Sequence, residues 1–483
     1  MDNLFDYQVD EVRTLQQVAA RHPCIIEGGD PGTGKTYVLS AVCADADAPA
    51  FVICPKPVVG SWFKVLTEAG VNILGVANYE LIRNGKFYAT AAQFTSGQGV
   101  PCPYIEVAKE DGAMAEFAWR FPDGTYIIID EAHRGKNNIT IASHMMLSMK
   151  PVIPQGGNNR LFILSGTITD KVECFRVAAH LLDITQYGKH AYSRWLRGLA
   201  DKYPGLSQLE AIHHEVYPEH GSRMRKTDER VRAMFRANNI RTECVPVSPD
   251  VERMITEAYQ DIADAIMRLR TKEQGEMCAL TAMLRARQRI EMLKIEPIIQ
   301  LATEHLLRES AVIIFVNFDN TIDTLFTALD SVVQQEFQSF ITFVRGGQSS
   351  AEREAEIAKF QSGESCLMIA NIEAGGIGIS LHHIDPRAKP RVAVFSPPWS
   401  SITLKQGTDR IHRAGALSDA VQIIVYCKGW VAPAGERNKN DTSFTGDDGA
   451  KVGIEELIAQ AVNKKLRTIE WINNGDEDDL TQI

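Results

Sequence analysis

The sequence predicts an α/β protein with two lobes that each contain a parallel sheet, plus helical insertions between the lobes. Two regions of the chain contain short, continuous apolar runs separated by helical segments, as is typical of parallel strands covered on both faces. A mostly helical stretch separates these regions. The runs span residues 24–27, 50–54, 126–129 and 161–164 in the first region, and 311–316, 366–370, 392–395 and 421–426 in the second. We therefore expect a first lobe at 1–170, helical insertions at 171–300 and a second lobe at 301–483.

The remaining elements follow from periodicity and from turn residues. The first 20 residues predict a helix, because apolar residues recur there at helical spacing. Glycine, proline and short alternating stretches predict an inserted hairpin within residues 86–125. The spacing of Ile255, Tyr259, Ile262, Ile266 and Leu269 predicts a long helix with one apolar seam. Residues 428–452 are rich in Gly, Asn, Asp and Ser, and predict a loop before a final amphipathic helix that carries Ile454, Leu457, Ile458 and Ala461.

Composition excludes several classes of protein. The 483 residues are 45% hydrophobic and 23% charged, which is ordinary for a globular chain, and no apolar run is long enough to span a bilayer. The nine cysteines form no Cys-x-x-Cys pair, so we expect buried thiols rather than disulfides or a zinc site. The acidic start lacks the features of a signal peptide, and we expect a soluble, intracellular protein. A net charge of −10 is compatible with a positive cleft for nucleic acid but not with a basic wrapping surface.

A phosphate-binding loop follows the first apolar run. Residues 29–36 match the pattern G-x-x-x-x-G-K-S/T between a predicted strand and a predicted helix, where backbone N–H groups and the helix dipole favour phosphate. Lys35 would neutralise the β- and γ-phosphates, and the Thr36 hydroxyl would bind Mg²⁺. The sequence therefore predicts ATP and Mg²⁺ as cofactors, with ATP bound by Gly29, Asp30, Pro31, Gly32, Thr33, Gly34, Lys35 and Thr36.

Two acidic residues complete this site at the end of another apolar run. Asp130 follows Ile127-Ile128-Ile129, as a second Mg²⁺ ligand would, and Glu131 beside it is suited to orient or deprotonate the attacking water. An Asp-Glu pair after a strand is more often a helix N-cap. The phosphate-binding loop upstream favours the catalytic interpretation.

The order of the motifs resembles that of superfamily 2 helicase-type ATPases, specifically the Swi/Snf-like branch of DNA translocases. The resemblance covers nearly the whole chain and implies two RecA-like lobes. It also implies adenine recognition by Gln8, DNA contact by Pro55, Lys56 and Tyr79 (with Trp62 in the first of these motifs), and coupling of ATP to DNA by Ser165, Gly166 and Thr167. The basic segment Arg223-Met224-Arg225-Lys226 resembles the one that leads toward the second lobe.

In the second lobe, the resemblance implies further DNA contacts at Gly375, Gly376 and Gly378. It implies an arginine-finger motif with catalytic Gln406, Arg410 and Arg413, which would join Lys35, Asp130 and Glu131. The chain departs from the family pattern at Ile168, Asp170, Ser380 and Ala416, none of which is a phosphate, metal or arginine-finger group. The helical Arg285, Arg287 and Arg289 favour a solvated face over DNA contact, and Trp195, Trp399 and Trp430 favour packing.

These motifs predict a DNA-stimulated ATPase that acts as a monomer and moves along double-stranded DNA, with replication, repair or transcription proteins as further partners. Two alternatives remain open: a strand-separating helicase, and a DNA-binding scaffold that has lost hydrolysis. The intact Lys35, Asp130 and Glu131 disfavour the scaffold, and the second strand-and-helix lobe disfavours a P-loop ATPase that acts on protein.

Overall fold

The computed structural model describes residues 4–108, 115–135, 140–166, 172–271, 276–375, 379–399, 401–428, 444–445, 451–452 and 455. These residues divide into two compact units, the first ending at Phe235 and the second beginning at Arg236. The segment 171–300 is therefore shared between the units. Its first part completes the first unit, and the rest begins the second.

The first unit is built on a six-stranded parallel sheet with the order β10-β1-β9-β8-β2-β3. Four strands lie where the apolar runs predict them, and the two edge strands, β3 and β10, were missed. The strands are β1 (Cys24–Glu27), β2 (Ala50–Cys54), β3 (Ile73–Asn78), β8 (Tyr126–Asp130), β9 (Arg160–Leu164) and β10 (Gly221–Ser222).

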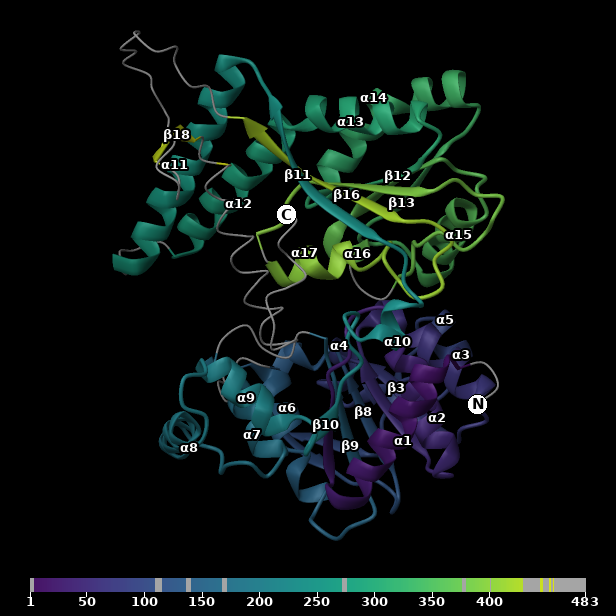
Figure 1. The fold of residues 1–483 in the computed structure, drawn as a ribbon, viewed down its shortest axis with the longest axis vertical. Coiled ribbons are helices and arrows are strands. Elements are labelled where there is room, and N and C mark those ends of the chain that lie inside the picture. The colour runs from purple at the N-terminus through teal and green to yellow at the C-terminus, as the bar shows by residue number, and fades with distance from the viewer. Residues whose placement is uncertain are drawn as a thin grey trace. The chain divides into compact units, whose positions relative to one another are not determined.

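Helices cover both faces of this sheet (Figure 1). Alternate strand residues belong to different core clusters: Ile25 packs with α1 (Asp6–Arg21) and α2 (Lys35–Asp45), whereas Ile26 packs on the opposite face. The first cluster also includes α3 (Val59–Glu68), and the second includes α6 (Ile141–Leu147), α7 (Arg176–Leu181), α8 (Lys189–Lys202) and α9 (Gln208–Val216). Burial on both faces explains why the central strands are continuously apolar.

The predicted insertion at 86–125 contains two small antiparallel pairs rather than one hairpin. In the first pair, β4 (Lys86–Phe87) meets β5 (Val100–Pro101), and in the second β6 (Ile105–Ala108) meets β7 (Glu116–Trp119). The short helix α4 (Tyr79–Ile82) precedes the first pair, α5 (Ala91–Thr95) connects its two strands, and α10 (Glu229–Arg232) lies near the end of the unit.

The second unit has its own six-stranded parallel sheet, with the order β11-β16-β15-β12-β14-β13. Its strands are β11 (Asn238–Pro246), β12 (Ala311–Val316), β13 (Ile341–Val344), β14 (Leu367–Asn371), β15 (Arg391–Phe395) and β16 (Ala420–Lys428). The four predicted runs are confirmed. The edge strand β11 lies in the stretch predicted to be mostly helical. The prediction of helix is wrong for these residues.

Helices also cover both faces of the second sheet, since Ile313 and Ile314 belong to different core clusters. These helices are α13 (Ile295–Leu307), α14 (Asp319–Phe337), α15 (Ser350–Gln361), α16 (Ile372–Gly375) and α17 (Ser401–Thr408). The predicted apolar seam lies on α11 (Pro249–Thr271), which pairs with α12 (Glu276–Leu293) around a small core of Ala258, Ile262, Ala286 and Ile290. The two-lobe α/β fold is thus confirmed.

The end of the chain is described at a few residues. The short strands β17 (Phe444–Thr445) and β18 (Lys451–Val452) pair within the predicted 428–452 loop, and the predicted final helix lies outside the described residues except for Glu455. None of the nine cysteines is in a disulfide. In the part of the chain that the structure describes, no helix combines the length and apolar character needed to cross a membrane.

Candidate nucleotide-binding site

The loop at residues 29–36 joins β1 to α2, as the sequence predicts. Two of its glycines have left-handed backbones, with φ of 87° at Gly32 and 93° at Gly34, which disfavour any residue with a side chain. A Cβ atom on Gly34 would also lie 2.1 Å from the Gln8 side-chain nitrogen. The loop therefore needs these glycines to wrap closely around a ligand at the start of α2.

The Lys35 ammonium lies within the curve of this loop. It donates to the carbonyl oxygens of Gly29 at 2.6 Å and Asp30 at 3.2 Å. The adjacent Thr36 is partly exposed at the first turn of α2, so its hydroxyl can reach a ligand there. The loop thus places one cation and one hydroxyl where phosphate and metal binding require them.

Helix α1 supports the loop from behind. The Gln8 amide nitrogen donates to the Thr33 carbonyl at 2.9 Å, and its oxygen accepts from the Phe5 N–H at 3.0 Å. The Tyr7 hydroxyl also donates to Thr33, at 3.0 Å. Gln8 is 4% exposed. In this geometry Gln8 fixes the loop, and its adenine contact stays a prediction.

The basic segment 223–226 is also hydrogen-bonded to the phosphate-binding loop. The Arg223 guanidinium donates to an Asp30 carboxylate oxygen at 3.2 Å and to the Gly28 carbonyl at 3.1 Å. The Lys226 N–H donates to the other Asp30 oxygen at 2.8 Å. Both side chains of the Arg223–Asp30 pair are nearly buried, so this ion pair is shielded from solvent. The segment therefore holds the phosphate-binding loop as well as leading toward the second unit.

Asp130 ends β8, where each of its carboxylate oxygens accepts a hydrogen bond. The indole N–H of Trp62 donates to Oδ2 at 2.9 Å, and the Glu131 N–H donates to Oδ1 at 2.9 Å. Burial and the neighbouring Glu131 raise the pKa of Asp130 to about 6, whereas the Trp62 hydrogen bond and Lys35 oppose that shift. A cation beside Asp130 would favour its ionised, metal-binding form.

Two residues of the expected DNA-contacting motifs support Asp130 instead of facing solvent. Trp62 is fully buried on α3, so its side chain packs inside the first unit, and DNA contact by the motif that contains it stays a prediction. Tyr79 is 7% exposed and donates from its hydroxyl to the Asp130 carbonyl at 2.7 Å. No sequence signal links Trp62 or Tyr79 to Asp130, because the contacts arise from the packing of α3 and α4 against the carboxyl end of β8.

Glu131 connects the acidic motif to the expected coupling motif. Its backbone is left-handed, with φ of 54°, a strained conformation for a residue other than glycine. Its carboxylate lies 3.2 Å from His133 Nδ1, which in turn lies 3.3 Å from the Ser165 hydroxyl. A Cβ atom on Gly166 would lie 2.7 Å from the Pro31 ring. The loop after β9 therefore meets both the acidic motif and the phosphate-binding loop, while Thr167 lies outside the described residues.

Two carboxyl groups are buried beneath this site. Glu27 accepts from the Gly29 N–H at 3.0 Å, and Glu11 accepts from the Ser222 hydroxyl at 2.8 Å. Burial raises the pKa of Glu27 to about 8 and that of Glu11 to about 7. Sequence analysis missed both. Glu11 lies on the helix α1 and Glu27 ends the strand β1, and the sequence around each residue does not indicate that both are buried.

The other expected DNA contacts of the first unit, Pro55 and Lys56, follow the carboxyl end of β2. Pro55 is buried at the end of β2, whereas Lys56 begins a short 3-10 helix and is exposed. A pocket of about 360 Å³ nearby is lined by Tyr79, Glu80, Arg83, Arg134, Thr140, Ile141, Ala142 and Met145. Among the described residues, Lys56, Arg83 and Arg134 are therefore cations of this region that a phosphate could reach.

In the second unit, the arginine-finger motif lies between α17 and β16. Arg410 is 4% exposed and donates to the Ile379 carbonyl at 3.4 Å, and Arg413 donates to the same oxygen at 3.0 Å and is partly exposed. Gln406 is 9% exposed on α17. Gly375 ends α16, and Gly376 and Gly378 lie outside the described residues. The motif thus packs against the residues that follow the glycines.

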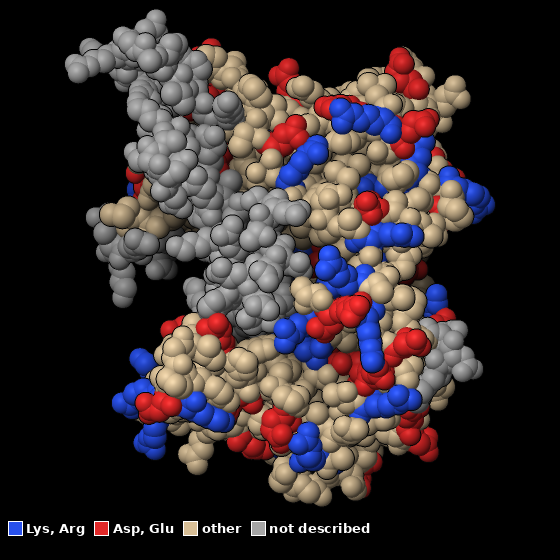
Figure 2. Space-filling view, in the orientation of Figure 1, with Lys and Arg blue, Asp and Glu red and all other residues tan. Residues whose placement is uncertain are grey.

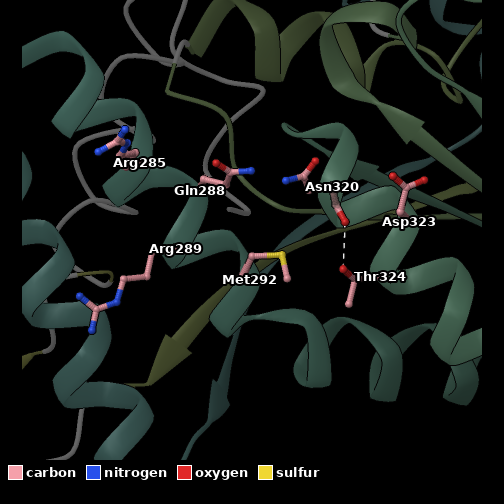
Figure 3. Close-up of a pocket in the computed structure, with 7 residues that line it drawn as sticks. All are labelled: Arg285, Gln288, Arg289, Met292, Asn320, Asp323 and Thr324. Carbon is pink, nitrogen blue, oxygen red and sulfur yellow. Dashed lines mark hydrogen bonds between the residues drawn. The ribbon is translucent and has the colours of Figure 1, made fainter. Parts of the chain in front are cut away.

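A pocket of about 580 Å³ lies between α12 and α14 of the second unit. In Figure 3, Gln288 and Met292 point from α12 toward Asn320 and Thr324 of α14, while Arg285 and Arg289 stand at the α12 side, away from α14. Both arginines are exposed, and Arg289 lies 3.5 Å from Glu257, as expected of a solvated face. Arg287 differs, because its guanidinium stacks on Trp399, which is 49% exposed rather than packed.

The chain resembles known proteins along its whole length. The helicase conserved C-terminal domain matches residues 293–415. A putative ATP-dependent RNA helicase of Acanthamoeba polyphaga mimivirus is 28% identical over 98% of this chain and 84% of its own length. A putative ATP-dependent helicase/translocase of Bacillus subtilis is 22% identical over 80% of this chain, and a probable chromatin-remodeling complex ATPase chain of Oryza sativa is 23% identical over 87%. The chain spans 42% and 38% of the lengths of these last two proteins.

Two solved structures also show similarity. The SWI2/SNF2 ATPase core of Sulfolobus solfataricus in complex with dsDNA is 17% identical, with a TM-score of 0.36, over 98% of this chain and 94% of that one. Dbp5 of S. cerevisiae bound to RNA is 13% identical, with a TM-score of 0.48, over 96% of this chain and 88% of that one.

Proposed function

We propose that the chain is a superfamily 2 helicase-type ATPase of the Swi/Snf-like kind, to which its relatives are similar, and that it uses ATP hydrolysis to move along double-stranded DNA. The observation that carries this proposal is the packing of the Ser165-Gly166 loop against both the phosphate-binding loop and His133. A nucleotide-dependent change in the phosphate-binding loop or at His133 would therefore shift the Ser165-Gly166 loop, as coupling of hydrolysis to movement requires.

In the proposed reaction, Lys35 leaves the loop carbonyls and pairs with the β- and γ-phosphates of ATP. Thr36 and Asp130 would hold Mg²⁺, which supplies charge neutralisation to the phosphate oxygens when it is bound. Glu131 orients the attacking water and accepts its proton. His133, 3.2 Å from that carboxylate, keeps Glu131 in place.

We propose that the arginine-finger motif of the second unit supplies positive charge to the transition state. Arg413 is the better candidate for contact with the γ-phosphate, because it is partly exposed whereas Arg410 is buried. An arginine finger accelerates phosphoryl transfer by about 10³–10⁵-fold. We therefore expect Arg413→Ala to lower the DNA-stimulated kcat by at least about 10³-fold, measured as phosphate release. A variant that hydrolyses ATP at the wild-type rate would remove Arg413 from the reaction.

Three measurements test the translocation proposal directly. ATP hydrolysis is measured with and without duplex DNA, and we expect clear stimulation by the duplex. Displacement of a third strand from a triplex, without separation of a plain duplex, then identifies movement without unwinding. Hydrolysis that ignores DNA would refute the proposal.

A second candidate function is the unwinding of RNA, which the name of the mimivirus relative favours. The same assays separate the two candidates when duplex RNA is included. Stimulation by RNA but not by DNA, together with ATP-dependent separation of an RNA duplex, would establish the helicase and exclude the DNA translocase.

A further inference from the structure

Helix α8 is firmly attached to the first unit through one face. Tyr192 donates from its hydroxyl to the Val172 carbonyl at 2.5 Å, and Tyr192 and Leu199 are buried. Trp195 packs on the Tyr192 ring, with centroids 5.3 Å apart, and on the Phe175 ring at 6.2 Å. This anchoring fixes which side chains of α8 point toward solvent.

The opposite face of α8 is basic. Lys189, His190, Arg194 and Arg197 are all exposed, and the last three recur at the i, i+4 and i+7 spacing of one helix face. Figure 2 shows this cluster of blue side chains over α8, at the lower left of the view. Asp201 follows on the same face at the far end of the helix.

These cations differ from most others on the surface of the first unit. Within the described residues, Lys189, Arg194 and Arg197 have no ion-pair partner. Six other exposed cations of the unit are paired, in Arg13–Asp10, Arg21–Glu219, Lys64–Glu68, Arg120–Glu106, Lys202–Glu215 and Arg230–Asp10. Among the described residues, the exposed Lys56, Arg83, Lys86 and Arg232 are also outside ion pairs, but they do not share one helix face. An unpaired basic face stands out on a chain with a net charge of −10.

The helix dipole makes this placement unfavourable in isolation. The N-terminus of a helix carries partial positive charge, and acidic residues normally offset it. The first turn of α8 has no acidic residue, begins with Lys189 and His190, and follows Gly188, which provides no side-chain cap. Arg194 and Arg197, three residues apart, add mutual repulsion, although Asp201, four residues after Arg197, offsets part of it. A bound anion would relieve both effects at once.

We propose that the exposed basic face of α8 is a contact site for the phosphate backbone of the nucleic acid on which the enzyme acts. The site lies outside the motif loops at the sheet edge, and the inference rests on the proposed function. From Lys189 to Arg197 the face extends about 12 Å along the helix axis, which corresponds to about three base-pair steps of duplex. The contact reads charge and not sequence, because it consists of backbone-binding side chains.

The test compares two double variants that remove the same number of positive charges. In Arg194→Gln with Arg197→Gln, the basic face loses both arginines but keeps good helix formers. In the control, Arg13→Gln with Arg120→Gln, two exposed arginines are removed from surface ion pairs. Binding to a blunt DNA duplex is measured by fluorescence anisotropy without nucleotide, over about 50–200 mM KCl.

Each phosphate contact adds about 0.9 to the slope of log K against log salt, so the α8 variant should lose about 1.8 units of slope. Its affinity near 100 mM salt should fall by about tenfold or more. The control should keep the wild-type slope, and both variants should keep the DNA-independent ATPase rate and melting temperature. An unchanged slope in the α8 variant would overturn the inference while leaving the proposed function intact. A wild-type protein that binds no duplex and gains no activity from it would instead overturn the proposed function.

Discussion

The hydrogen bond from Trp62 to Asp130 leads to a sharp prediction for the variant Trp62→Phe. Phenylalanine retains an aromatic ring in the core of the first unit but removes the indole N–H that donates to Asp130 Oδ2 at 2.9 Å. Asp130 would then lose a bond to a charged group, which is worth about 1.5–3 kcal/mol. Because this carboxylate is the proposed Mg²⁺ ligand, the loss should appear in metal binding as well as in stability.

The expected size of the effect follows from what supporting hydrogen bonds do for metal ligands. Removing such a partner commonly costs about 10–100-fold in metal affinity or activity. We expect the half-saturating Mg²⁺ concentration of the ATPase to rise by about that factor. A second readout is binding, as the Mg²⁺-dependent rise in melting temperature with a non-hydrolysable ATP analogue should shrink in parallel.

Another buried tryptophan supplies the control. Trp119 is 5% exposed, and its indole N–H donates to the Ser148 hydroxyl at 2.9 Å rather than to a residue of the acidic motif. Trp119→Phe therefore removes a similar hydrogen bond from the same unit and should lower the melting temperature without changing the Mg²⁺ dependence. Equal Mg²⁺ dependence in the two variants would refute the assignment of Trp62 as a positioning residue.

Three further predictions concern pH, coupling and the second unit. The pKa of Glu27 is raised from 4.5 to about 8, so the folded unit keeps a proton that the unfolded chain releases, and stability should fall as pH rises through about 5 to 8. Glu27→Gln should flatten this slope in calorimetric melts. Ser165→Ala removes the contact with His133 and should leave DNA-independent hydrolysis within a few-fold of wild type while reducing strand displacement. Lys294 and Glu455 form a buried ion pair, so Lys294→Met should destabilise the second unit by about 3–5 kcal/mol in chemical denaturation, and adding Glu455→Met should recover most of that loss.

The central strands could be predicted from sequence, whereas the four edge strands, β3, β10, β11 and β13, could not. β1, β2, β12 and β15 are buried on both faces and are therefore apolar without interruption. The edge strand β11 alternates partly buried and exposed residues, because one side of it faces solvent. β10 is two residues long and holds no apolar residue, so its place beside β1 depends on tertiary contacts alone. Sequence periodicity detects long apolar runs, and it fails where a strand is partly exposed, as β11 is, or too short and polar to form a run, as β10 is.

The same distinction explains which parts of the candidate site could be predicted. The phosphate-binding loop and the Asp130-Glu131 pair depend on local backbone chemistry, which short motifs encode. Trp62 was missed as a support for Asp130 because the two residues are 68 positions apart and share no motif. The buried Glu11 and Glu27 were missed for a similar reason, since an isolated glutamate on a helix or strand is usually exposed.

Asp30 shows how a variable position of a motif acquires a specific role from the fold. The pattern G-x-x-x-x-G-K-S/T leaves this position open, and backbone geometry requires no acidic residue there. In this chain its two carboxylate oxygens accept from the Arg223 guanidinium and the Lys226 N–H, on the segment that leaves the first unit at Phe235. Because the Arg223–Asp30 pair is nearly buried, its attraction is weakly screened, and a shift of the loop on phosphate binding would displace that segment as well. The segment that connects the first unit to the second is thus hydrogen-bonded to the phosphate-binding loop before it leaves the first unit.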